Sequence, residues 1–310
     1  MSSFLHLPDA MRNRISGLSS TSDTYDNREM SWCTTTMTSL RLFRCCGRKL
    51  SDIPVFRLPN VTHLEIKSMA TYDGYAGLGA TLSELRQLRS LSLMCITLDQ
   101  TNVFSEVASA MPLLPNLSAL ALQHVVTTQR LPPSTVALLC EALRGCVSLR
   151  RVYWDHALSR VNLPTYMETI ATHRDLEAFH LVVRDERMCG SLLRYICRHL
   201  PPRLSVLSLS SMKKGCYDGP SAFGFLWAHF TDLSFLNVRI RGGPAVTVRD
   251  VIRGARRVQL VGYDWQFREV IHRDGEPVLL PAWPTRMVEL CEIKDFGCES
   301  WNWLMRHLVL

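Results

Sequence analysis

The chain has 310 residues, of which 47% are hydrophobic and 20% are charged, and a net charge of +7 from 35 basic and 28 acidic residues. This composition is typical of a folded protein and excludes disorder over most of the length. The basic residues are spread along the chain, so the charge favours acidic partners only mildly. No apolar run approaches the roughly 18 residues that a membrane span needs, so no membrane association is expected.

The N-terminus lacks the apolar core of a secretory signal. Arg12 and Arg14 suggest a transit peptide, but Asp9 and Asp23 argue against one. The number of cysteines, eleven, is odd, and the sequence contains no C-x-x-C pair. We therefore expect buried, reduced thiols and an intracellular protein, cytoplasmic or nuclear.

The first segment, 1–34, carries one amphipathic helical candidate at 7–18, followed by a polar stretch rich in serine and threonine. It is predicted to cap the elements that follow.

From 35 to 261 one pattern recurs, with apolar residues at positions a, a+3 and a+5. The last two alternate, which predicts a strand with both side chains on one face. Copies begin 22 to 33 residues apart, and this recurrence at similar intervals indicates internal repeats. The first residues of the copies are Met37, Val61, Leu88, Leu117, Leu149, Leu176, Leu204, Leu233 and the weaker Ala255, and a marginal further copy begins at Val288, beyond this range.

The segments between these strands favour helices. In the clearest one, 132–145, Ser134 stands where an N-cap belongs and Gly145 where a C-cap glycine belongs. Similar helices are predicted at 103–111, 166–172, 190–199 and 222–229. Each strand-helix unit has one apolar face that only a neighbouring unit can bury.

This alternation resembles leucine-rich repeats of the ribonuclease-inhibitor type. The resemblance implies an α/β solenoid, or horseshoe, with a parallel sheet on the concave side and helices on the convex side. The Asn or Cys that usually stands at a+8 is present in one copy only, as Cys45, so we expect an irregular array.

The tail, 262–310, breaks the repeat and holds four of the seven tryptophans, at Trp265, Trp283, Trp301 and Trp303. Because a solenoid exposes the apolar end of its last unit, this tail is predicted to be a C-terminal cap. A docking surface for another protein is the alternative.

Catalytic and metal-binding signatures are missing from the sequence. It has no phosphate-binding glycine loop, no H-E-x-x-H and no G-x-S-x-G, and its ten histidines form no i, i+4 pair. Cys197 and His199 are two residues apart and would not face each other on a helix. We therefore expect no enzyme, no metal and no cofactor.

With a+3 and a+5 directed inward, positions a+2, a+4 and a+6 face the concave side. Small Ser and Ala side chains predominate on the central strands, which leaves room for a bulky partner. Charged and aromatic residues among these positions, together with one asparagine, are the predicted partner-binding residues, with Arg151, Tyr153 and Asp155 first. The full set is Arg41, Phe43, Lys67, Arg151, Tyr153, Asp155, His180, Phe235, Asn237, Arg239 and Arg257.

The sequence thus predicts a non-catalytic scaffold that binds a protein on its concave face. Two alternatives stay open. Leu7, Pro8, Ile15, Leu18 and Trp32 resemble parts of an F-box, which implies a substrate adaptor of a ubiquitin ligase bound to a Skp1-type linker. The basic charge would also suit a subunit of a large ribonucleoprotein assembly, with nucleic acid as a less favoured partner.

Overall fold

The computed structural model describes residues 39–43, 60–68, 77–95, 101–124, 131–213, 220–240, 246–283 and 299–308. The predicted N-terminal cap with its F-box-like residues, and the marginal repeat at Val288, lie outside these ranges. None of the described helices is long and apolar enough to cross a membrane.

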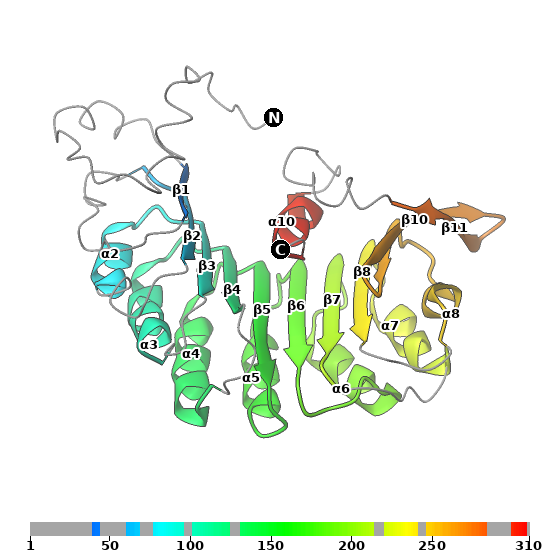
Figure 1. Cartoon of the computed structure of the whole chain (residues 1–310), viewed down its shortest axis with the longest axis horizontal. Coiled ribbons are helices and arrows are strands. Elements are labelled where there is room, and N and C mark those ends of the chain that lie inside the picture. Colours follow the sequence, from blue (N-terminus) through cyan, green and yellow to red (C-terminus); the bar gives the residue numbers. More distant parts are fainter. Residues whose placement is uncertain are drawn as a thin grey trace, which may run out of the picture.

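The described strands form one sheet whose eleven members follow chain order (Figure 1). Strands β1 to β9 are parallel, whereas β10 is antiparallel to both β9 and β11. The bounds are β1 Ser39–Phe43, β2 His63–Ser68, β3 Ser90–Cys95, β4 Ala119–His124, β5 Arg151–Leu158, β6 Ala178–Val183, β7 Val206–Ser211, β8 Phe235–Ile240, β9 Leu260–Tyr263, β10 Gln266–Arg273 and β11 Glu276–Ala282.

Helices cross over between the parallel strands and line the convex side of the curved sheet (Figure 1). They are α2 Leu78–Glu84, α3 Thr101–Ala110, η4 Met111–Leu113, α4 Pro133–Gly145, α5 Asn162–Ile170, α6 Gly190–His199, η5 Pro220–Phe223, α7 Gly224–His229 and α8 Val248–Ile252. The final helix, α10 Glu299–Leu308, lies on the opposite, concave side. The predicted α/β solenoid, with the sheet inside and the helices outside, is confirmed.

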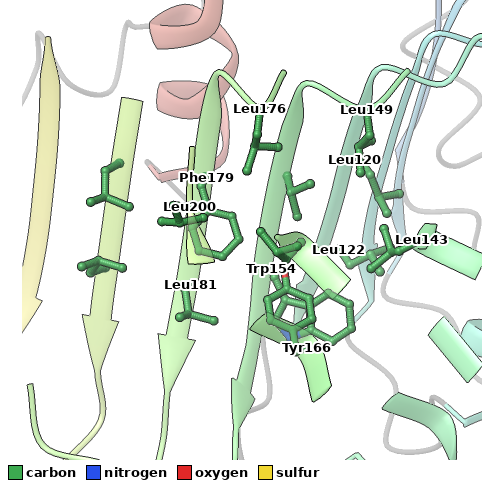
Figure 2. Close-up of a cluster of buried hydrophobic side chains, with 14 of the residues drawn as sticks. Leu120, Leu122, Leu143, Leu149, Trp154, Tyr166, Leu176, Phe179, Leu181 and Leu200 are labelled. Atoms are coloured by element: carbon green, nitrogen blue, oxygen red, sulfur yellow. The ribbon is translucent and has the colours of Figure 1, made fainter. Parts of the chain in front are cut away.

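Two rows of apolar side chains run across the sheet and form the core with the convex helices. The a+3 row aligns Leu64, Leu91, Leu120, Val152, Phe179, Leu207, Leu236 and Val261 in register. The a+5 row aligns Ile66, Leu93, Leu122, Trp154, Leu181, Leu209 and Val238. Figure 2 shows part of both rows meeting Leu143, Tyr166 and Leu200 from the convex side. The predicted inward direction of a+3 and a+5 is therefore confirmed.

The ninth repeat was predicted in the wrong register. Phe235 pairs with Leu260 and not with Arg257, so Val258, not Ala255, occupies position a. Arg257 precedes the strand, is exposed, and its Nη1 donates to Oδ1 of Asp232 at 2.7 Å. Both registers offer three apolar residues, so the pattern alone could not separate them.

The caps predicted for α4 were also wrong. The helix begins at Pro133 after an N-cap at Pro132, which places Ser134 inside its first turn. Gly145 is the last helical residue, and Cys146 is the C-cap. Proline suits the first helical position because it lacks the N–H that would have no partner there.

The end of the parallel array is built from two tight hairpins. The turn between β9 and β10 has positive φ at Asp264 (46°) and Trp265 (67°), and the next turn has positive φ at Asp274 (52°) and Gly275 (83°). Consecutive positive φ values give the hairpin twist that matches the twist of the strands. Part of the Trp-rich tail thus extends the sheet, while α10 returns to the concave face.

Candidate protein-interaction site on the concave face

Helix α10 packs on β5, β6 and β7, over the face that the sequence predicted to bind a partner (Figure 1). Its side chains Trp301, Trp303, Leu304 and Met305 are buried. They form one cluster with the sheet, here called the concave cluster, whose other members are Ala119, Ala121, Tyr153, Ala178, Val206, Phe235, Leu260 and Phe267. Small alanines and large aromatic side chains thus belong to the same cluster.

The first turn of α10 is held by hydrogen bonds to the beginnings of the strands. Ser300 Oγ donates to Oε2 of Glu177 at 3.1 Å and accepts from Nε of Arg151 at 3.2 Å. Arg151 and Glu177 also form an ion pair at 3.6 Å. Nε1 of Trp301 donates to Oγ of Ser234 at 2.9 Å, so the buried indole N–H is satisfied.

The last turn of α10 is held by Tyr153. Its hydroxyl donates to the backbone carbonyl of His307 at 2.9 Å. The final carbonyls of a helix have no partner within the helix, so this bond satisfies an acceptor that α10 cannot satisfy itself. Strand β5 therefore contacts both ends of α10, through Arg151 and Tyr153.

A buried polar row lies beside this contact. The ring of His180 stacks on Tyr153 with centroids 4.1 Å apart, and its Nδ1 lies 2.8 Å from Oγ of Ser208. Nδ2 of Asn237 donates to the same Ser208 oxygen at 2.8 Å. Burial lowers the pKa of His180, and the nearby Asp155 carboxylate opposes that shift. Burial also raises the pKa of Tyr153, so both rings are neutral at pH 7.

Acidification is expected to destabilise the fold through His180. Because the pKa of His180 is lowered from 6.5, the unfolded chain binds this proton more tightly than the folded chain. The stabilising contribution is complete above pH 6.5 and is lost as the pH falls toward the native pKa. Urea unfolding measures the decrease in the free energy of unfolding between about pH 7 and about pH 5.5. This decrease should be smaller for His180→Gln than for the wild type. Equal losses would contradict this assignment, since His173, whose pKa is also lowered, is present in both proteins.

A second group of residues stands at the rim of the concave face. The Arg239 guanidinium lies 3.5 Å from the centroid of the Trp265 ring, a cation–π contact. Burial lowers the pKa of Arg239, and Tyr153 and Asp155 oppose that shift. Trp265 is 62% exposed and Asp155 is half-exposed. We call Asp155, Arg239 and Trp265 the rim patch.

The structure sorts the predicted partner-binding residues into three groups. Arg151, Tyr153, His180, Phe235 and Asn237 come together on the concave face, where the prediction placed them. The sequence treated them as an open surface, yet Tyr153, His180, Phe235 and Asn237 are at most 2% exposed. Asp155 and Arg239 lie at the rim, and Arg257 lies off the strands. For Arg41, Phe43 and Lys67 the described part covers only the strand backbone.

Sequence reasoning missed α10 as the occupant of this face. One signal was present: Trp301, Leu304, Met305 and Leu308 follow the i, i+3, i+4, i+7 spacing of an amphipathic helix. Such a helix needs an apolar surface to cover. Tyr153, Ala178 and Val206, at positions a+2 or a+4 of β5, β6 and β7, belong to that surface.

The described residues contain no group of three His, Cys, Asp or Glu side chains that could hold a metal ion. Cys140, Cys146 and Cys197 are buried free thiols, as predicted, and Cys189 is half-buried. Burial raises the pKa of Cys146 to about 11 and of Cys197 to about 12, which keeps both thiols protonated and poorly nucleophilic.

The fold is that of an α/β solenoid, because parallel strands in chain order alternate with helices on the convex side. The leucine-rich repeat-containing protein LegL7 from Legionella pneumophila is a similar solved structure. It matches with 14% identity and a TM-score of 0.48, over 79% of this chain and 80% of that chain. No protein-family model matches the sequence, and no curated protein matches it.

Proposed function

We propose that this chain is a non-catalytic scaffold that binds a protein partner through the concave side of the array, with the rim patch as its exposed anchor. The observation that carries the proposal is the position of Trp265. A large aromatic ring stands 62% exposed at a turn, stacked on an arginine from the concave rows.

The residue types of the rim patch favour a binding role over a packing role. Tryptophan and arginine are enriched at the energetic centres of protein interfaces. The hairpin turn between β9 and β10, in which Trp265 has a φ of 67°, presents this exposed ring to solvent.

Replacing Trp265 by alanine should weaken partner binding by about tenfold or more, as expected for an interface centre. Quantitative affinity purification of the intact chain from its native cells measures the change. The matched control is Leu138→Ala, because Leu138 is also exposed (44%) but lies on the convex helix α4. Proteins lost with Trp265→Ala and retained with Leu138→Ala are the expected result, with unchanged circular dichroism. Equal recovery with both variants would overturn the proposed site.

The F-box hypothesis is tested separately with the same purified chain. Co-purification of a Skp1-type linker, abolished by removing residues 1–34, would support it. A clean absence of the linker from the intact protein would reject it.

A further inference from the structure

We propose that the concave face of β5 to β8 is a receptor for a short amphipathic helix and that α10 is its internal occupant. A partner protein that presents a helix of the same chemistry docks there by displacing α10. This inference deepens the proposed scaffold function, on which it rests, by stating what the partner presents.

The face contacts a helix at both of its ends. Arg151 and Glu177 hold the Ser300 hydroxyl in the first turn, and Tyr153 holds the His307 carbonyl in the last. His307 lies seven positions after Ser300, which is roughly 10 Å along a helix axis. The receptor therefore selects a helix of about two turns with a hydroxyl or similar polar group at its beginning.

The cluster between these contacts defines the anchors of the helix. Trp301 packs against Phe235 with ring centroids 5.9 Å apart and donates to Ser234. Leu304 and Met305, one turn further on, are fully buried. A matching partner helix carries an indole or phenol in its first turn, which can donate to Ser234, and aliphatic side chains at i+3 and i+4.

The composition of the face favours reversible docking. On the opposite side of the same strands, the core rows from Leu64 to Val261 and from Ile66 to Val238 contain only apolar residues. The concave rows instead include His180, Ser208 and Asn237, all buried while α10 is in place. Within the described part of the chain, Asn237 Oδ1 has no hydrogen-bond partner, and His180 Nε2 lies 3.9 Å from Oδ1 of Asp155. Uncovering the face lets water reach such groups, which lowers the cost of removing α10.

The test uses the full chain and a fluorescent peptide with the sequence of residues 297–310 as the probe. In the wild type, α10 competes with the peptide for the face. Leu304→Asp places a charge in the concave cluster and should release α10, so this chain should bind the peptide at least tenfold more tightly than the wild type. Leu138→Asp makes the same substitution on the convex side and should bind like the wild type. Leu304→Ala should act in the same direction with a smaller change, which keeps the test valid if Leu304→Asp disturbs folding.

Two further variants test the chemistry of the contact. A peptide with Trp301→Ala should lose most of its binding to the Leu304→Asp chain, and adding Tyr153→Phe to that chain should weaken the unmodified peptide several-fold. Folded Leu304 variants that bind the peptide no better than the wild type would overturn the proposal. Light scattering that shows wild-type dimers exchanging α10 would also overturn it, because the natural occupant would then be a second copy of this chain.

The two proposals fail in different ways. If the peptide does not bind while Trp265→Ala still removes a cellular partner, the scaffold function stands and the helix receptor is wrong. If the peptide binds as expected while no partner depends on Trp265, the receptor stands and the rim patch is wrong.

Discussion

Replacing Trp154 by alanine should lower the free energy of unfolding by about 4 kcal/mol, the largest loss expected from a single side chain in this protein. Trp154 is completely buried, and in the a+5 row it lies between Leu122 and Leu181 of the neighbouring strands. Its ring centroid is 4.7 Å from that of Tyr166 on α5, so it fills the space between the sheet and the convex helices (Figure 2). Alanine would leave a cavity lined by several repeats.

Chemical denaturation of the purified chain measures this loss, and Trp154→Phe is its matched control. Among the described residues, Nε1 of Trp154 has no hydrogen-bond partner. Phenylalanine therefore keeps an aromatic ring in contact with Tyr166 and removes no hydrogen bond. The loss of unfolding free energy should be less than half of that caused by alanine. Equal losses for the two variants would show that Trp154 does not act through the volume it fills.

Replacing Gly262 by alanine should cost about 2 kcal/mol, since added atoms in a packed interior force neighbours out of place. A methyl group at Gly262 would lie 2.6 Å from Cε1 of Phe267 and closer still to Oδ1 of Asn237. Neither neighbour has free space, because Phe267 is 2% exposed and Asn237 is fully buried. The absence of a side chain here lets β10 return across β9 and place Phe267 in the concave cluster.

The control for this prediction is Gly145→Ala at the end of α4. A methyl group there would meet no atom within 4 Å, so the change should be neutral or slightly stabilising. Thermal unfolding of both variants should separate them by several degrees. A Gly262→Ala protein as stable as Gly145→Ala would show that Asn237 and Phe267 move aside without cost.

The repeat could be predicted because its signal is local. Leu117, Leu120 and Leu122 face the core because of backbone geometry alone. The same spacing correctly identified eight of the parallel strands. The helix 190–199 was predicted with its observed bounds for the same reason. The register of the ninth strand was predicted wrongly because the pattern is ambiguous there: Ala255 and Val258 both start an acceptable match.

Whether the concave face is open or covered could not be predicted from a local pattern. Tyr153 and Phe235 were correctly placed on that face, but nothing near them in sequence shows that they are covered. Their cover comes from residues more than 60 positions away, and the Tyr153–His307 bond spans 154 positions. Contacts of that range depend on the assembled shape of the array, which a local sequence pattern does not describe.

Because the chain is synthesised from its N-terminus, strands β5 to β8 are made well before the helix α10 that covers them. Strand β8 ends at Ile240 and α10 begins at Glu299, so 58 residues are added after the receptor strands are made and before their cover exists. At about 5–20 residues per second, a ribosome needs roughly 3–12 s for that length. During this interval α10 has not yet been made and cannot cover β5 to β8. A chaperone or partner that binds these strands at that time meets no competing helix.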